Sequence, residues 1–408
     1  MATRPGTLSA INETPRLGFV DLFSGAGGMS YGFFKHPSFT VLAAADAEVG
    51  KPSMRAGTLR CNSTYAANMG LRPVSVNLST IEPEELRGVL GIGGAPVNVL
   101  SVCPPCTGFS RANPQNHLRD DDRNNLVQRA ARFATALDAD VVVMENAREV
   151  VNGNFAGHFS AFRDHLESRG YSVAPMICVM SRFGVPQVRE RAIVIAAKQE
   201  LKIRTLEDLW QGYRVGDGAI TVRAAWSEIP GHATGRDQFP SFASTGVAAR
   251  LAAVPRDGGS WIDLTLHRNA EELLTGGMKR ILRLGKTGSH PDIYGRMHWD
   301  RPAPTIKREC AHVGNGRYAH PDDNRLCSIR EMACLQGFPV EFQFPGTSLA
   351  NNYRHIGDAV PPLISYQLAH VCHWIITGVR PRIEDAILEG THLRRTHLEK
   401  CGVRKGES

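Results

Sequence analysis

Short apolar runs alternate with segments of helical period through the first half of the chain. The runs that predict buried strands are 19–23, 40–45, 97–102, 140–144 and 191–197. Between them, apolar residues recur with helical spacing, most clearly over 126–137 and 155–169. Strand and helix in alternation predict an α/β fold with a doubly wound, mainly parallel sheet, whose strands are joined by right-handed crossovers.

The alternation fades after about residue 198. As far as about residue 300 the chain is richer in glycine, proline, serine and polar residues, which predicts a smaller, loop-rich domain with irregular strands. Helical spacing resumes over 328–335, and a final helix is predicted from about 363 to 376. The predicted division is a flexible N-terminus over 1–16, an α/β domain over 17–200 and 326–390, a small domain over 201–325, and a solvated basic tail over 391–408.

Composition says more about the binding partners of the protein than about its fold. The chain has 408 residues, of which 42% are hydrophobic, and this suits one large domain with a smaller one. A formal net charge of +7 favours a polyanionic partner, although charge alone leaves other partners equally open. No apolar run approaches the roughly 18 residues that cross a bilayer, and the N-terminus lacks the apolar stretch of a signal peptide. We therefore expect no membrane association. Nine scattered cysteines without framework spacing predict reduced thiols and a cytoplasmic protein.

A glycine-rich turn follows the first predicted strand, over 21–28. Ligands of doubly wound sheets gather at the carboxyl ends of the strands, and residues without Cβ let a backbone approach a ligand closely. Phe23 stands inside this turn, where a dinucleotide site would have small residues, and its ring is suited to packing on an adenine or a sulfonium. A nicotinamide-binding loop and a plain tight turn are the alternatives.

Cys106 follows the third predicted strand in a loop that Pro104 and Pro105 make stiff. A structural thiol would more often sit on an apolar face, and a zinc site would need further Cys or His residues at ligand spacing, which the sequence lacks. We therefore expect no metal. Cys103 and Cys106 have the spacing of a thioredoxin-like pair, although no compact thioredoxin unit surrounds them. A nucleophile is the best interpretation of Cys106.

Three charged residues stand at the ends of later strands. Glu145 closes the fourth predicted strand, where a carboxylate is costly to desolvate and therefore either caps a helix or acts as an acid. Arg189 and Arg191 precede the next strand two residues apart, and residues at that spacing share one face of an extended chain. Both guanidinium groups are predicted to point into one site, with a solvated edge pair as the alternative.

In this order, these residues resemble the motifs of the DNA cytosine-5 methyltransferase family, over nearly the whole chain. The matching segments are 21–28, 104–110, 145–147, Gln187 with Arg189 and Arg191, 330–339, and 356–362. The resemblance implies a Rossmann-like methyltransferase domain and a target-recognition domain. It also implies double-stranded DNA as the partner and S-adenosylmethionine as the donor of a methyl group for carbon 5 of a flipped cytosine.

The resemblance implies roles for four catalytic residues. Cys106 adds covalently to carbon 6 of the cytosine, and a site that favours its thiolate is needed because a free cysteine is mostly protonated at neutral pH. Glu145 donates a proton to ring nitrogen 3. Arg189 and Arg191 are expected to stabilise the thiolate by charge and to bind the cytosine carbonyl.

The resemblance also implies the residues that hold the methyl donor. They are Phe23, Gly25, Ala26, Gly27, Gly28, Asp46, Asn77, Pro105, Asp358 and Val360. Asp46 is expected to accept hydrogen bonds from both ribose hydroxyls. Asp358 and Val360 are expected to close over the cofactor, so the C-terminal helix should be part of the catalytic domain.

Four features depart from the family pattern. Cys103 stands where glycine is common, and we expect this adjacent thiol to make activity depend on reductant. Thr107 replaces the usual glutamine after the nucleophile. Asn77 stands where an aspartate often binds the adenine amino group, and its side-chain carbonyl still offers an acceptor. The segment 49–63 is longer than the family pattern, and the sequence alone offers no physical reason for it.

The residues that would read a DNA sequence are predicted over 265–295. The basic and histidine side chains there are His267, Arg268, Lys279, Arg280, Arg283, Lys286 and His290, and a solvated basic loop is an equal alternative. The competing functions are a transfer-RNA cytosine-5 methyltransferase, a non-catalytic DNA-binding protein of the same fold and a nicotinamide oxidoreductase. We expect a monomer, whose partner in a restriction–modification system would be a cognate restriction endonuclease.

Overall fold

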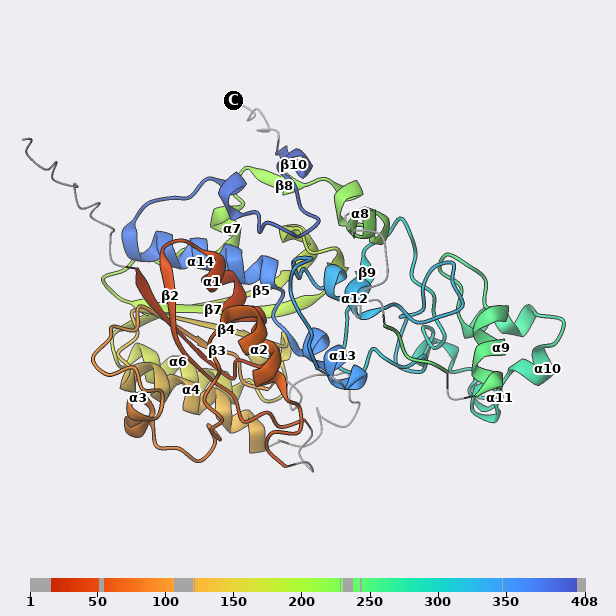
Figure 1. The fold of residues 1–408 in the computed structure, drawn as a ribbon, viewed down its shortest axis with the longest axis horizontal. Helices are drawn as coiled ribbons and strands as arrows, with labels where there is room; N and C mark the ends of the chain where they lie inside the picture. Colours follow the sequence, from red (N-terminus) through yellow and green to blue (C-terminus); the bar gives the residue numbers. More distant parts are fainter. Residues whose placement is uncertain are drawn as a thin grey trace, which may run out of the picture.

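The computed structural model describes residues 16–50, 55–105, 120, 122–227, 229, 238–242, 244–346 and 348–401. A larger α/β lobe and a smaller helical lobe lie side by side (Figure 1). The smaller lobe carries α9 (Thr245–Ala253), α10 (Ala270–Leu273) and α11 (Gly276–Arg283). The larger lobe holds the central sheet and both ends of the described chain.

The central sheet has its strands in the order β2, β1, β3, β4, β7, β5. Their bounds are β1 Leu17–Leu22, β2 Phe39–Ala45, β3 Val99–Val102, β4 Val141–Asn146, β5 Tyr171–Val179 and β7 Glu190–Lys198. The first four strands are parallel, whereas β7 runs antiparallel to both β4 and β5. The mainly parallel sheet is confirmed, but the expectation of a parallel strand over 191–197 is wrong. The link from β5 to β7 is short, and parallel neighbours need a crossover of about a dozen residues or more.

Alternate residues of the strands face two separate cores. Phe19 and Val99 point into the core beneath α1 (Gly28–Lys35) and α14 (Pro362–Thr377), whereas Val20 and Leu100 point into the core beneath α4 (Asn125–Ala136) and α6 (Gly157–Glu167). Figure 1 shows these two helix pairs on opposite faces of the sheet. Helices on both faces define the doubly wound architecture that the sequence predicts.

The expected helices over 126–137, 155–169, 328–335 and 363–376 occur as α4, α6, α12 and α14. The remaining larger-lobe helices and short strands are α2 (Cys61–Met69), α3 (Leu86–Val89), α5 (Glu149–Asn152), β6 (Gln187–Val188), α7 (Leu206–Leu209), β8 (Tyr213–Val215), α8 (Val222–Ser227), β9 (Ala303–Pro304), α12 (Ile329–Leu335), α13 (Leu349–Asp358) and β10 (Leu398–Lys400). Within the described ranges, every helix is too short or too polar to cross a bilayer.

The smaller lobe is helical, so the expectation of irregular strands there is wrong. Among the described residues from 244 to 302, the only β pairing is an isolated bridge of Arg296 to Ala319. The serines and threonines that suggested loops instead begin helices: the side chains of Ser244, Ser260 and Thr275 each accept a hydrogen bond from the backbone of the following turn. A polar segment of this kind can therefore encode capped short helices as readily as turns.

The larger lobe extends further in sequence than expected at two places. Residues 206–209 form α7, which packs against α14, and β8 pairs with β10, so the chain enters the smaller lobe well after residue 201. The solvated tail expected from 391 onward is also wrong for residues 391–393. Thr391, His392 and Leu393 are buried, and Leu393 packs against the backbone of Gly184.

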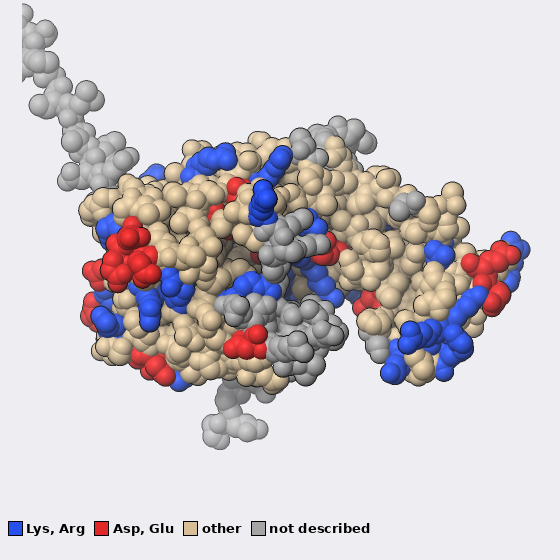
Figure 2. Space-filling view, turned by 90° about the horizontal axis from the view of Figure 1, so that it is seen from below, with Lys and Arg blue, Asp and Glu red and all other residues tan. Residues whose placement is uncertain are grey.

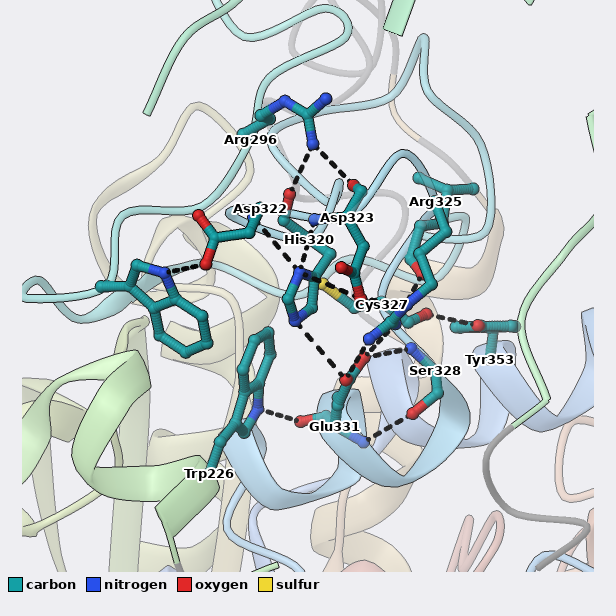
Figure 3. A network of polar contacts seen from close by, with 12 residues as sticks. Trp226, Arg296, His320, Asp322, Asp323, Arg325, Cys327, Ser328, Glu331 and Tyr353 are labelled. Atoms are coloured by element: carbon teal, nitrogen blue, oxygen red, sulfur yellow. Dashed lines mark hydrogen bonds and ion pairs between the residues drawn. The ribbon is translucent and has the colours of Figure 1, made fainter. Parts of the chain in front are cut away.

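A polar and aromatic network joins the two lobes (Figure 3). The ring of His320 stacks on Trp226 of α8, with centroids 5.3 Å apart, and its Nδ1 accepts hydrogen bonds from the backbone of Asp322 and Asp323. Glu331 of α12 accepts two hydrogen bonds of 2.8 Å from Arg325. Burial lowers the pKa of His320, which keeps the ring neutral. These contacts hold the two lobes together through polar groups whose hydrogen bonds are made to one another.

Candidate active site

The polar residues at the carboxyl ends of β1, β2, β3 and β4 lie along one edge of the sheet, because these four strands are parallel neighbours. Phe23 follows β1, Asp46 follows β2, and Pro104 with Pro105 follows β3. Glu145 is the last residue but one of β4. The order of the strands therefore sets the order of these groups along the edge.

Glu145 is buried at this edge and meets two arginines. Its Oε1 lies 3.1 Å from Arg191 Nε and 3.9 Å from Arg189 Nη2. The two arginines reach the same carboxylate because they are two residues apart on extended chain, as the sequence predicts. Glu145 Oε1 and Arg191 Nε form an ion pair without hydrogen-bond geometry, and neither atom makes another hydrogen bond in the part of the chain that the structure describes. Such buried atoms suit a site that completes its contacts with a ligand.

The two arginines differ in their surroundings. Arg189 is 2% exposed, and its guanidinium donates to the carbonyl groups of Ile306 at 3.1 Å and Ala359 at 3.4 Å. Arg191 has a side chain that is 16% exposed, and it donates to the neighbouring Glu190 carbonyl. Arg189 therefore ties Glu145 to two distant segments, whereas Arg191 faces the accessible part of the site.

The loop after β3 is anchored to the end of β4. Asn146 Nδ2 donates to the Pro104 carbonyl at 3.0 Å, and the Glu145 backbone N–H donates to Cys103 Sγ at 3.3 Å. Residues 106–119, which include Cys106 and Thr107, lie outside the described residues. The anchored loop nevertheless delivers the chain to Pro105, one residue before Cys106, beside Glu145.

Cys103 is a packed thiol in this arrangement. Burial raises its pKa well above the usual value, and the nearby carboxyl groups of Asp21 and Glu145 act in the same direction. A thiol in such surroundings stays protonated, and the thiolate is the form that oxidises readily. The structure thus gives Cys103 a contact with β4 and offers no support for the expected redox role.

The glycine turn after β1 meets both β2 and the end of α13. Gly25 donates its backbone N–H to Asp46 Oδ2 at 2.9 Å, and Phe23, Gly25 and Gly27 have positive φ angles of 61°, 53° and 95°. A Cβ atom on Gly28 would come within 2.3 Å of the Val360 carbonyl oxygen. The sequence needs glycine at this position because two segments 330 residues apart are in backbone contact here. Ala26, within the turn, is buried.

Asp46 and Asp358 face the same region. Burial raises the pKa of both carboxyl groups, that of Asp358 to about 6 despite its ion pair with Arg308 at 2.9 Å. Protein surrounds Asp358 closely enough to desolvate it, yet 36% of its side chain is open to water. The carboxylate of Asp358 is therefore accessible to a ligand.

Asn77 does not offer the acceptor that the sequence suggests. Its side chain is exposed, and Oδ1 accepts hydrogen bonds from the backbone N–H of Ser79 at 3.0 Å and from its hydroxyl at 2.8 Å. Both lone pairs of the carbonyl oxygen are therefore used within a local turn. The backbone beside it does reach the site, because the Val74 carbonyl accepts from Asp46 N–H at 3.1 Å.

The long segment after β2 has a physical explanation in the structure. The Glu48 carboxylate accepts from the backbone N–H of Asn62 at 2.8 Å and so caps α2, while Leu59 N–H donates to the Glu48 carbonyl at 2.9 Å. The two ends of the insertion are thus held together by the contact between Glu48 and Leu59. Thr58, next to this contact, is bound to α13, because Asn351 Nδ2 donates a hydrogen bond to its carbonyl at 3.0 Å. Residues 51–54 lie outside the described ranges.

Two site residues escaped the sequence analysis. Arg308 lies in a polar stretch without periodicity, and only its three-dimensional neighbours single it out. Gln187 was noted as part of a motif but given no task; it is fully buried, its Nε2 donates to Gln336 Oε1 at 2.6 Å, and its Oε1 accepts from Ile306 N–H at 2.8 Å. A glutamine between the apolar residues Pro186 and Val188 is the signal that could have marked it as a structural link.

Comparisons with known proteins agree with this architecture. Residues 17–374 match the family model for C-5 cytosine-specific DNA methylase. The type II methylase M.HgiDII of Herpetosiphon aurantiacus is 31% identical over 371 residues, which are 89% of this chain and 97% of the relative. The type II methyltransferase M1.BsuMI of Bacillus subtilis is 27% identical over 90% of this chain and 82% of its own.

Solved structures share the fold. A DNA modification methyltransferase encoded within an E. coli prophage superimposes with a TM-score of 0.59 at 20% identity, over 88% of this chain and 99% of its own. The Entamoeba histolytica methyltransferase EhMeth gives 0.57 at 14% identity, over 88% and 98%. The fold is thus that of the Rossmann-like methyltransferases. The chain belongs to the C-5 cytosine-specific DNA methylase family and is a DNA (cytosine-5) methyltransferase by class.

Proposed function

We propose that this protein transfers a methyl group from S-adenosylmethionine to carbon 5 of a cytosine that has been rotated out of duplex DNA, with Cys106 as the nucleophile. The observation that carries the proposal is the contact of buried Glu145 with Arg189 and Arg191, beside the anchored loop that leads to Cys106. The family membership of the chain supports the same chemistry.

The base must be activated before it can accept a methyl group. Addition of the Cys106 thiolate to carbon 6 breaks the aromaticity of the ring and places electron density on carbon 5. Arg191 is positioned to bind the cytosine carbonyl oxygen, because it is the more accessible of the two arginines. Glu145, in its protonated form, donates to ring nitrogen 3 as charge builds up there. Loss of the carbon 5 proton to water then releases Cys106.

The residues at the sheet edge fit the proposed methyl donor. When bound, S-adenosylmethionine supplies an electrophilic methyl group on a sulfonium. The glycine turn allows the backbone to approach the ligand closely. Phe23 and Asp46, beside this turn, are available to bind the adenosine end. Asp358 and Val360 reach the same turn from the end of α13. Pro105 is exposed and directly follows Pro104, whose carbonyl accepts a hydrogen bond from Asn146.

We assign the smaller lobe to target recognition. Figure 2 shows basic side chains gathered on this lobe beside the hollow between the lobes. Of the basic side chains predicted to read DNA, Arg268, Arg280, Arg283 and Lys286 are exposed, whereas Lys279 is bonded to Glu271. Exposed cations beside a cleft suit contacts to DNA phosphates. The relatives are named type II methylases, and we therefore propose the modification role of a restriction–modification system.

Covalent trapping tests the proposal directly. Duplex oligonucleotides that contain 5-fluorocytosine should form an adduct with the protein in the presence of S-adenosylmethionine, visible on denaturing electrophoresis, because fluorine blocks loss of the carbon 5 substituent. Cys106→Ser should abolish the adduct, whereas Cys401→Ser, at an exposed cysteine, should leave it unchanged. An adduct with transfer RNA instead of DNA would establish the competing function, and no adduct with either would refute the proposal.

Bisulfite sequencing of host DNA, with and without the gene, would identify the methylated sequence. A recurring methylated motif that depends on Cys106 is the expected result. Random or absent methylation would contradict the proposed modification role.

A further inference from the structure

Arg308 occupies an unusual position beside the proposed cofactor site. It follows β9, where the chain returns from the smaller lobe, and its Nη1 lies 2.9 Å from Asp358 Oδ2. Its Nη2 donates to the Gly50 carbonyl in the insertion after β2. Its Nε is buried and makes no hydrogen bond within the described part of the chain. A half-buried guanidinium with unused donor capacity points to a further acceptor.

The order of the strands locates this arginine relative to the cofactor. Along the sheet edge, the segment at Val74 lies outside β2, followed by Asp46 at the end of β2 and the glycine turn after β1. A donor with its ribose at Asp46 and its methyl group toward Glu145 would pass the glycine turn with its sulfonium, from which the amino-acid end also branches. Asp358 lies there, because Val360 touches Gly28.

The charges at this point match an amino acid. The methionine end of S-adenosylmethionine is a zwitterion, with an ammonium and a carboxylate on one carbon. The Arg308–Asp358 pair offers the complementary charges, with 25% and 36% of the two side chains open to water. Arginine is suited to a carboxylate because its N–H groups form a planar fork.

We propose that Arg308 binds the carboxylate of the methionine end of S-adenosylmethionine, while Asp358 receives its ammonium group. The inference deepens the proposed function and rests on it. Each protein charge keeps an opposite charge nearby with and without the ligand, so binding leaves no buried charge unpaired. Burial raises the pKa of Asp358 to about 6 in the free protein, and an ammonium group bound beside it would favour the ionised carboxylate further.

Two ligands that differ only in the carboxylate test this assignment: S-adenosylmethionine and its decarboxylated form. Calorimetric titration of the full chain without DNA measures binding independently of turnover. Arg308→Met should weaken binding of S-adenosylmethionine by roughly ten- to a hundredfold, the range of a hydrogen bond to a charged group. Binding of the decarboxylated ligand should change less than about threefold, and Arg308→Lys should restore part of the difference.

Arg354→Met is the matched control. Arg354 also pairs with a carboxylate, that of Glu309 at 3.0 Å, but it is not one of the two residues that we propose bind the methionine end. It should affect both ligands equally and slightly. Thermal melting of each variant verifies that it is folded.

The outcomes distinguish failure of the proposed methyl donor from failure of the role proposed for Arg308. If the unaltered protein binds neither ligand, the proposed methyl donor itself is wrong. If it binds both, and Arg308→Met weakens both to the same extent or neither, Arg308 is only a structural link between Gly50 and Asp358, and the inference is overturned. A selective loss for the carboxylate-bearing ligand is the result that supports it.

Discussion

The catalytic edge of the larger lobe and the surface of the smaller lobe use charge in opposite ways. At the catalytic edge, Glu145 and Arg189 are buried and already in contact. On the smaller lobe, Arg280 and Arg283 extend from α11 into solvent. Chemistry on a base needs groups that are desolvated and fixed before the substrate arrives, whereas recognition of a long polyanion is served by exposed cations.

The same contrast appears in how the two regions are held together. The larger lobe has two apolar cores on either side of a sheet, and its site residues come from strand ends that cannot shift independently. The smaller lobe consists of short helices begun by serine and threonine caps around a few buried side chains such as Trp261 and Met278. We infer that changes in the first region damage catalysis, and changes in the second tune affinity.

The largest expected effect is at the catalytic edge. Glu145→Gln removes the proton donor but keeps the shape of the side chain, and it should lower the rate of methyl transfer by about 10²- to 10⁴-fold, as is typical for loss of general acid catalysis. Incorporation of labelled methyl groups into DNA measures this. Glu149→Gln, at a neighbouring glutamate paired with Arg148, should retain most activity. Equal rates for both variants would show that Glu145 is no acid.

A change where the glycine turn meets Val360 should come next. Gly28→Ala places a Cβ atom 2.3 Å from the Val360 carbonyl oxygen, and overpacking of this kind lowers the free energy of unfolding by roughly 1–3 kcal/mol. Gly88→Ala, in α3 with open space around it, should be neutral or slightly stabilising. Urea denaturation compares the two. If Gly28→Ala leaves the free energy of unfolding unchanged, the glycine turn can move away from Val360, and the catalytic edge is less rigid than we infer.

Acid should destabilise the core beneath α14. His36 Nε2 and His370 Nδ1 lie 3.3 Å apart, with His373 and Asp385 nearby, and burial lowers the pKa of His36 to about 3 and that of His370 to about 4. The unfolded chain, with pKa values near 6.5, binds these protons first. The free energy of unfolding should therefore fall as pH drops below about 6.5, by at most about 1.4 kcal/mol per pH unit for each histidine.

Stability measured by denaturation between pH 7 and pH 5 tests this dependence. His370→Gln should reduce it, although His36, His355 and His392 still contribute, whereas His312→Gln, at an exposed histidine, should leave it unchanged. A slope that is the same in all three proteins would assign the acid sensitivity to other groups.

The smallest effects are expected on the smaller lobe. Replacing Arg280 and Arg283 by alanine should weaken DNA binding for all sequences and reduce the slope of log affinity against log salt by about 1 for each phosphate that the variant no longer binds. The rate with saturating DNA should stay nearly constant. Fluorescence anisotropy at several salt concentrations measures the slope, and Arg395→Ala, an exposed arginine of the larger lobe, is the control. An unchanged slope would remove α11 from the DNA interface.

The sequence predicted the sheet well and the smaller lobe poorly, because the apolar pattern is informative only where an element is buried. Buried strands such as β1 and β4 are continuous apolar runs, because they are covered on both faces. β5 was missed because it lies at the edge of the sheet, where half-buried positions and Ser172 and Pro175 interrupt the apolar pattern. In the smaller lobe, serine and threonine indicate loops and helix caps equally, so composition could not decide between strands and helices.

The sequence by itself determined the α/β class, the family motifs and the face that Arg189 and Arg191 share, since these depend on periodicity and on residue types close together in the chain. Only the tertiary structure decided that Arg189 is tied to Ile306 and Ala359 whereas Arg191 stays accessible, that the oxygen of Asn77 is used locally, and that Arg308 meets Asp358. These contacts join segments far apart in sequence, and no local pattern records which of them will meet. Burial and hydrogen-bond partners follow from that meeting, and with them the chemistry that each side chain can perform.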